Sequence, residues 1–314
     1  MRNALRCYVS YALSLFGSVR IVHRPMFVSV EPAAICQLHC PECPVGVRKG
    51  ERLADRGERF LSREVWERVL EQITPYAHTV QFYFQGEPLL HKDLPRMINE
   101  AHERGLYTIV STNAQAMTAE LAEELVKAGL SKIIISMDGL TEETYKAYRV
   151  GGSLTQCMHA LSWLRAAKER LHGGTTIKLQ CLRLRSNEHE WKEFKKQYKA
   201  LGADQLVFKT AQLYDYSTGH LLMPSDERYS RYAKGTDGCY HRKPIGRGCL
   251  RVWGGVVITT TGEVLPCCYD KAHAHAYGNI MKESLGALFR NERALAFRRA
   301  ALKQSPDICK QCWK

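Results

Sequence analysis

The chain of 314 residues lacks an apolar run of transmembrane length and lacks a clean signal-peptide cleavage site. Both absences favour a reducing compartment, where disulfide bonds are rare. The sequence nevertheless contains twelve cysteines, and in such a compartment cysteines serve metals rather than disulfides. We therefore expect a cytoplasmic protein that holds metal centres.

A basic stripe interleaved with aromatic residues is also missing, although the formal net charge is +13. That charge is compatible with nucleic acid, an anionic membrane surface or an acidic substrate. Its basic residues are scattered, with short pairs such as Lys195-Lys196 and Arg298-Arg299. We do not expect a nucleic-acid partner, because the aromatic platforms that usually accompany a basic footprint are absent.

Three cysteines stand close together in the run CQLHCPEC, namely Cys36, Cys40 and Cys43, directly after the strand-like stretch FVSVEP. No fourth cysteine follows nearby. Three such thiolates can hold three irons of a four-iron four-sulfur cluster and leave the fourth iron free for chemistry. A zinc knuckle or a redox thiol pair would use the same residues, so this run alone leaves the metal open.

The first 25 residues form a separate segment. Apolar residues recur at the i, i+3, i+4 spacing of an amphipathic helix, and Arg2 and Arg6 lie at its beginning. Three interpretations stay open: a helix packed against the main domain, a surface anchor on anionic lipid, and a signal peptide. The apolar positions are Leu5, Tyr8, Val9, Ala12, Leu13 and Phe16.

From 26 to 210 the chain alternates β-branched or aromatic runs with helix-period stretches, the pattern of βα units and a parallel sheet. Ser62 and Thr118 are expected to cap two of the helices. Six units are too few to close an eight-stranded barrel. The expected strands are 27–30, 79–84, 107–112, 132–137, 176–184 and 205–210.

The spacing of the cysteine trio resembles the signature of the radical S-adenosylmethionine enzymes. In that family the open iron binds the amino and carboxylate groups of S-adenosylmethionine, and its cleavage yields a deoxyadenosyl radical. The resemblance implies a partial (β/α)6 TIM-like barrel, S-adenosylmethionine as cofactor and a flavodoxin- or ferredoxin-type reductant. One position departs from the pattern, because the residue before the third cysteine is usually aromatic and is Glu42 here.

Further motifs follow the expected strand ends, where ligands of such barrels lie. Gln85-Gly86-Glu87-Pro88 is similar to the family's GGEP motif, with Gln in place of the first Gly, and Ser136-Met137-Asp138-Gly139 resembles a stretch of sulfatase-maturase-like members. By this resemblance the GGEP-like motif holds the methionine amino group, Ser136 binds the cofactor and Arg149 grips its carboxylate. The expected cofactor-binding residues are Gly86, Glu87, Asn113, Ser136, Asp138 and Arg149.

Beyond 210 the alternation stops, and we expect a linker over 211–248 that covers the barrel mouth. A second cysteine set then follows in 249–314, with Cys249, Cys267, Cys309 and Cys312, and a Thr-Gly hairpin signal lies between the first two. This region resembles the twitch domain, the short single-cluster form of the SPASM domain, so these four cysteines would hold an auxiliary four-iron four-sulfur cluster. Structural zinc would use the same ligands. The family's G-x-x-x-P-C pattern favours Cys267 over Cys268 as the ligand.

The combined features predict a radical enzyme that abstracts hydrogen from a substrate and passes the remaining electron to the auxiliary cluster. Its cysteine pattern resembles that of an aminocyclitol dehydrogenase, so we expect oxidation of an alcohol carbon in a sugar or cyclitol, with Lys209 as the candidate base. Maturation of a peptide or protein side chain is the alternative, disfavoured because no peptide-recognition domain precedes the barrel. A zinc-bearing nucleic-acid-binding module is the remaining interpretation.

Overall fold

The computed structural model describes residues 2–47, 57–244, 249–310 and 312. These residues form two compact units. The first comprises Met1–Ile35, Lys49–Ile109 and Ile245–Lys314, and the second comprises Cys36–Arg48 and Val110–Pro244. The units therefore cut across the domain boundaries expected from the sequence, since the first unit holds segments from both ends of the chain. Those boundaries stay a prediction.

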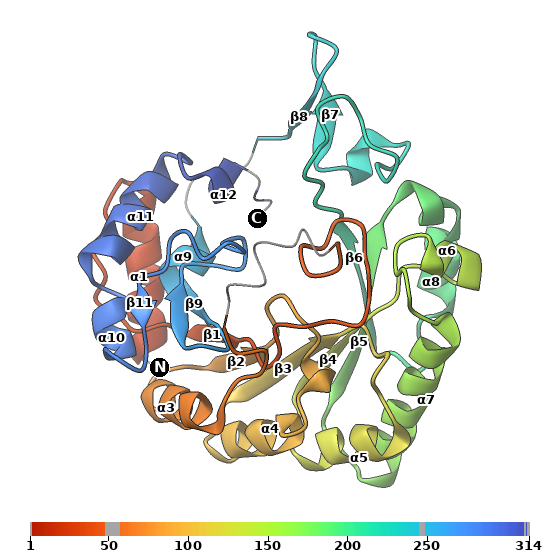
Figure 1. Cartoon of the computed structure of the whole chain (residues 1–314), viewed down its shortest axis with the longest axis horizontal. Coiled ribbons are helices and arrows are strands. Elements are labelled where there is room, and N and C mark those ends of the chain that lie inside the picture. Colours follow the sequence, from red (N-terminus) through yellow and green to blue (C-terminus); the bar gives the residue numbers. More distant parts are fainter. Residues whose placement is uncertain (1, 48–56, 245–248, 311, 313–314) are drawn as a thin grey trace. The chain divides into compact units, whose positions relative to one another are not determined.

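In the second unit, parallel strands alternate with helices. Lys132–Ser136 (β4) pairs with Thr176–Arg183 (β5), and β5 pairs with Gln205–Thr210 (β6). Every second residue of β5 is buried, beginning with Ile177 and Leu179, and α5 and α7 lie on one side of these strands (Figure 1). The other elements of this unit are α5 (Ala119–Lys127), α6 (Glu142–Lys146), α7 (Leu154–Arg170), η2 (Arg185–Glu190), α8 (Trp191–Gln197), η3 (Glu227–Tyr229), β7 (Tyr232–Lys234) and β8 (Tyr240–Arg242).

In the first unit, Phe27–Val30 (β1) is a central strand. It pairs in parallel with Thr79–Phe82 (β2) on one side and with Gly255–Ile258 (β9) on the other. β9 then forms the expected hairpin with Glu263–Leu265 (β10), which pairs with Gly278–Asn279 (β11). The other elements are α1 (Arg2–Leu15), α3 (Arg63–Ile73), η1 (Pro88–Leu90), α4 (Leu94–Glu103), α9 (Leu250–Gly254), α10 (Leu285–Leu288), α11 (Glu292–Leu302) and α12 (Asp307–Lys310), and the chain leaves this unit within β3 (Tyr107–Thr112).

The α/β class with a parallel sheet, expected from the sequence, is confirmed. Each of the six expected strands is present, and the second ends two residues early, at Phe82. The two expected helix caps also form, because Ser62 Oγ accepts the Val65 N–H at 3.2 Å and Thr118 Oγ1 accepts the Leu121 N–H at 3.1 Å. Among the helices of the described residues, none combines the length and apolar character needed to cross a bilayer.

The N-terminal helix α1 packs through its polar side. Cys7, Ser10 and Ser14 are buried, whereas the apolar positions of the i, i+3, i+4 pattern are exposed, as the surface-anchor interpretation requires. Ser10 Oγ lies 3.1 Å from His23 Nδ1, and His23 Nε2 lies 2.6 Å from the Trp253 carbonyl oxygen. Because a carbonyl oxygen only accepts, Nε2 carries the proton of the neutral ring. This chain of hydrogen bonds joins α1 to α9.

We predict that α1 loosens in mild acid. Burial, aided by the nearby Arg298 charge, holds the pKa of His23 below its usual 6.5, so the neutral ring stabilises the fold above about pH 6.5 and this contribution is lost as the pH falls through the folded-state value. Hydrogen exchange of α1 amides, corrected for intrinsic rates, should therefore rise between about pH 7.5 and about pH 5.5. His23→Gln should abolish most of this pH dependence, whereas His102→Gln, at an exposed histidine, should retain it. Equal pH profiles for wild type and His23→Gln would contradict the assignment.

Candidate active site

The segment from Cys36 to Val47 forms a tight turn in the second unit. The Cys43 N–H donates to the Cys40 carbonyl oxygen at 3.1 Å, and the Val47 N–H donates to the Cys43 carbonyl oxygen at 2.9 Å. Gly46 lies against this backbone, because a Cβ atom there would approach the Cys40 nitrogen to 2.6 Å. The three cysteines are therefore held by a backbone that requires glycine at one position, a requirement that the sequence analysis missed.

Cys36 is contacted by polar groups that can tune a metal-bound thiolate. Its Sγ accepts the Leu38 N–H and an Asn113 Nδ2–H, each at 3.4 Å. Asn113 Oδ1 in turn accepts from Gln37 Nε2 at 3.3 Å. Hydrogen bonds to sulfur shift the reduction potential of an iron–sulfur cluster. Asn113, expected from the sequence as a cofactor-binding residue, thus contacts the cysteine turn, and Gln37 is an additional residue of this network.

Arg149 connects the turn to the strand ends. Its Nε donates to Asp138 Oδ2 at 2.6 Å, and its Nη1 lies 3.9 Å from Cys40 Sγ. Asp138 is fully buried, and its Oδ1 accepts the Leu182 N–H at 2.6 Å. Burial opposes the charge on Arg149, but the Asp138 carboxylate outweighs it and holds the pKa of Arg149 above its usual value. Since both Asp138 oxygens are used within the chain, we interpret Asp138 as the residue that positions Arg149.

The pKa of Cys40 is raised. Burial is the largest cause, and the nearby Cys43 thiol adds to it, whereas the Arg149 charge opposes the shift. A thiol of this kind favours its protonated form unless a positive centre compensates for the thiolate charge. Irons of a cluster provide that compensation, so the residues present fit such a group. Metal binding here would release protons.

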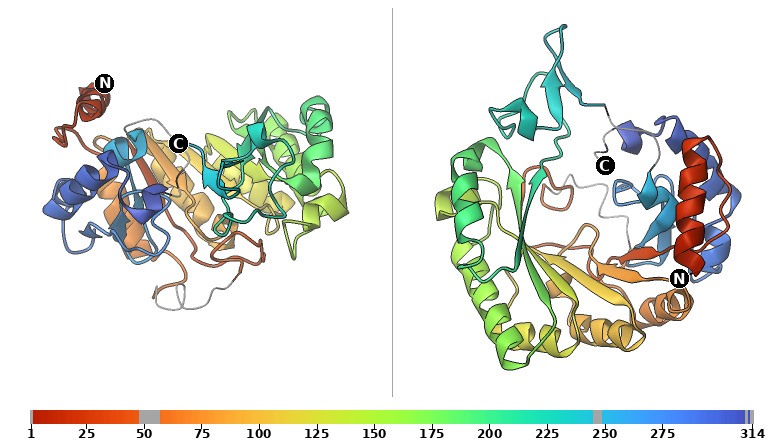
Figure 2. Two further views of the ribbon diagram at one scale, coloured as in Figure 1. Left: turned by 90° about the horizontal axis from the view of Figure 1, so that it is seen from above. Right: turned by 180° about the vertical axis from the view of Figure 1, so that it is seen from behind.

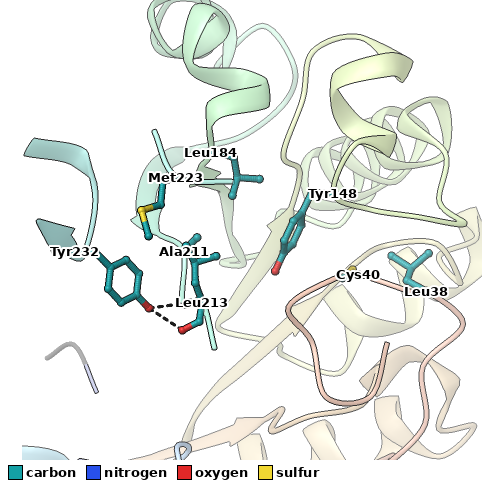
Figure 3. Packing of buried hydrophobic residues seen from close by; sticks show 8 residues of the cluster. All are labelled: Leu38, Cys40, Tyr148, Leu184, Ala211, Leu213, Met223 and Tyr232. Carbon is teal, nitrogen blue, oxygen red and sulfur yellow. Dashed lines mark hydrogen bonds between the residues drawn. The ribbon is translucent and has the colours of Figure 1, made fainter. Parts of the chain in front are cut away.

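Part of the segment after β6 packs on this turn. Figure 3 shows Ala211, Leu213, Met223 and Tyr232 in one buried cluster with Leu38, Cys40, Tyr148 and Leu184. Glu42, the departure noted in the sequence, connects the two segments: its Oε2 accepts the Tyr214 N–H at 2.9 Å, and its Oε1 lies 3.3 Å from His220 Nε2. The carboxylate therefore ties the segment to the position before the third cysteine.

The GGEP-like motif lies in the first unit. Gly86 packs against the chain that leads to Cys36, because a Cβ atom there would lie 1.9 Å from the Ala33 carbonyl oxygen. The Glu87 N–H donates to the Ile35 carbonyl oxygen at 2.8 Å, and Glu87 Oε1 accepts the Leu89 N–H at 3.1 Å. Gln85, where the family has glycine, donates from Nε2 to the Lys271 carbonyl oxygen at 3.0 Å. This bond joins the motif to the C-terminal region.

The C-terminal cysteines belong to the same first unit. Burial raises the pKa of Cys267 well above its usual value, and the neighbouring Cys268, Cys249 and Cys312 thiols raise it further. Cys268, Cys249 and Cys312 therefore lie near Cys267. Cys268 differs from Cys267 because Arg251 Nη1 lies 3.5 Å from its Sγ. A cavity of about 270 Å³ lies beside this pair, and its lining includes Ser29, Gln81, Tyr83, Arg251, Cys267 and Cys268.

The remaining expected residues are placed but not joined to these centres by a described contact. Ser136 is buried at the end of β4, and Lys209 is an exposed residue of β6 that pairs with Leu182. Their expected roles stay predictions. Within the described ranges, no three His, Cys, Asp or Glu side chains converge on a single ion position. A cubane does not require such convergence, because its thiolates bind different irons.

In a comparison with known protein families, two family models match the chain. The Radical SAM superfamily matches residues 30–180, and the iron-sulfur cluster-binding SPASM domain matches residues 249–313. The cysteine trio lies in the first range, and all four expected auxiliary ligands lie in the second. S-adenosylmethionine and two four-iron four-sulfur clusters, one catalytic and one auxiliary, are the cofactors of this combination.

Individual proteins agree with this assignment. A PqqA peptide cyclase of Granulibacter bethesdensis is 26% identical over 267 residues, which cover 78% of this chain and 68% of that protein. The Streptococcus suis SuiB structure bound to precursor peptide SuiA has a TM-score of 0.67 at 15% identity, over 97% of this chain and 74% of SuiB. BtrN in complex with AdoMet and 2-DOIA has a TM-score of 0.55 at 19% identity, over 92% and 93%. The chain therefore belongs to the radical SAM enzymes and carries a C-terminal SPASM-type iron–sulfur domain.

Proposed function

We propose that this radical SAM enzyme modifies a side chain of a peptide or protein. The observation that carries the proposal is the similarity to a PqqA peptide cyclase along 78% of the chain. The fold neighbour SuiB, bound to a precursor peptide, supports the same class of substrate. This reverses the preference for a sugar or cyclitol drawn from the cysteine pattern, because the sequence relatives favour the alternative. The flavodoxin- or ferredoxin-type reductant stays a prediction.

In this proposal some residues of the second unit would hold the catalytic cluster, and others would tune it. Cys36, Cys40 and Cys43 would hold the catalytic cluster, which when bound with S-adenosylmethionine supplies a deoxyadenosyl radical for hydrogen abstraction. Arg149, fixed by Asp138, presents the remaining guanidinium N–H groups beside Cys40, where they suit a carboxylate. Asn113 donates to Cys36 Sγ and so lowers the electron density on that sulfur.

The position before the third cysteine would control access to the turn. Glu42 holds the segment that contains Tyr214 and His220 against Leu38 and Cys40. Water near a substrate radical promotes side reactions, so a segment fixed here would protect the reaction.

The cluster assignment predicts a selective effect of cysteine substitution. Cys40→Ala should lose about half of the roughly eight irons of a doubly loaded chain and should form no deoxyadenosine from S-adenosylmethionine under reductant. Cys239→Ala, at an exposed cysteine of the same unit, should match wild type in both. Iron analysis and chromatography measure the two quantities. Deoxyadenosine formation by Cys40→Ala would disprove the assignment.

The substrate class predicts a selective product. Reduced enzyme given S-adenosylmethionine and a set of candidate peptides should convert at least one peptide to a product lighter by the hydrogens removed, with deoxyadenosine formed in proportion. Cyclitols and sugars should remain unchanged under the same conditions. Mass spectrometry reads both outcomes. Oxidation of a cyclitol without change to any peptide would restore the sequence-based preference and overturn the proposal.

Glu42 gives a local prediction that needs no substrate. Glu42→Ala should raise hydrogen exchange of the Tyr214–His220 stretch about fivefold, because one net hydrogen bond contributes about 1 kcal/mol. It should also lower the yield of modified substrate per deoxyadenosine formed. The matched control is Glu188→Ala, which removes the bonds that Glu188 accepts from the Ser225 N–H and hydroxyl in the same segment, without touching the cysteine turn. Equal exchange of the stretch in both variants would refute the role of Glu42.

A further inference from the structure

The exposed side of α1 is a continuous apolar stripe. Leu5 is 67% exposed, Val9 46%, Leu13 46% and Phe16 91%. Leu5, Val9 and Leu13 are four residues apart on α1 and so share one face, which Tyr8 and Ala12 extend, and Phe16 directly follows the helix. The opposite face is buried through Cys7, Ser10 and Ser14. The helix thus presents to solvent the side chains that an ordinary surface helix buries.

The charge around this stripe has one sign. Residues 2–30 contain Arg2, Arg6, Arg20 and Arg24 and no Asp or Glu. Arg2 and Arg6 lie at the beginning of α1 and are exposed, and Arg20 follows its end and is also exposed. An apolar stripe with exposed arginines at both ends is complementary to a surface that is apolar below and anionic above.

These observations distinguish between possible occupants. The stripe of a 14-residue helix is about 21 Å long and about 10 Å wide, or about 200 Å², far below the roughly 800 Å² that each partner of a stable complex buries. A second copy would also bring the same exposed arginines together, and like charges repel. A bilayer surface has neither limitation, because a helix that lies in the interface needs only its own apolar face.

We propose that α1 docks the enzyme on an anionic lipid surface, with Leu5, Val9, Leu13 and Phe16 among the acyl chains and with Arg2, Arg6 and Arg20 at the headgroups. The helix lies in the plane of the interface, because about 21 Å is shorter than the roughly 30 Å hydrocarbon core. The hydrogen bonds from Ser10 through His23 to Trp253 keep the polar face on the protein. The proposal is independent of the substrate.

Vesicle flotation with the full chain tests the proposal. The protein should float with vesicles that contain about one third phosphatidylglycerol and should remain unbound with pure phosphatidylcholine. Salt at about 0.5 M should reduce binding, since the Debye length then falls to a few ångströms. Leu5→Gln/Leu13→Gln should lower the partition coefficient at least about tenfold, because two large apolar side chains leave the bilayer.

Two matched variants separate docking from other effects. Leu221→Gln changes a leucine that is 90% exposed outside α1, and it should bind like wild type. Phe16→Trp should show a blue shift of its added fluorescence on anionic vesicles. Absence of flotation, equal binding to both lipids, or unchanged binding of the double glutamine variant would each overturn the proposal. A dimer in sedimentation that the double variant abolishes would assign the stripe to a second copy instead.

Discussion

The buried ion pair between Asp138 and Arg149 links the cysteine turn to strands β4 and β5. Asp138 follows the end of β4 and accepts the Leu182 N–H from β5, while Arg149 reaches from the pair toward Cys40. Removing one member of such a pair leaves an uncompensated charge, at a cost of about 3–5 kcal/mol. Asn187 adds to the same junction, because its Nδ2 donates to the Asp138 carbonyl oxygen at 2.8 Å. The geometry at Cys40 therefore depends on the register of β4 and β5.

The two positions where the sequence departs from the family pattern each make a local contact. Glu42 replaces an aromatic residue and receives the Tyr214 N–H, and Gln85 replaces a glycine and donates to the Lys271 carbonyl oxygen. Both side chains are longer and more polar than the residues they replace, so each reaches a backbone group of a distant segment. In each case the departing side chain forms a hydrogen bond to a distant backbone group, and a comparison of motifs cannot show this contact.

Much of the fold followed from local patterns, because strands and helix caps depend on residues a few positions apart. Ser62 and Thr118 were identified in this way. The orientation of α1 did not follow. Periodicity finds an apolar stripe but does not say which side meets the protein, and here Ser10 is satisfied inside by His23, thirteen residues away. The pairing of β1 with β9 joins residues more than 200 positions apart, and nothing in either strand specifies it.

Cys267 and Cys268 are adjacent, and only one of them is expected to bind the auxiliary cluster. Spacing allows either Cys267 or Cys268 as the auxiliary ligand, and the G-x-x-x-P-C pattern favours the first. In the structure Cys267 lies near Cys249 and Cys312. The Cys268 sulfur lies 3.5 Å from Arg251 Nη1. Arg251 also lies near Cys249, and Arg149 lies beside Cys40, so an arginine neighbour does not separate cluster ligands from other cysteines. Which of the two adjacent cysteines binds the auxiliary cluster therefore stays a prediction, and it rests on the G-x-x-x-P-C pattern that favours Cys267.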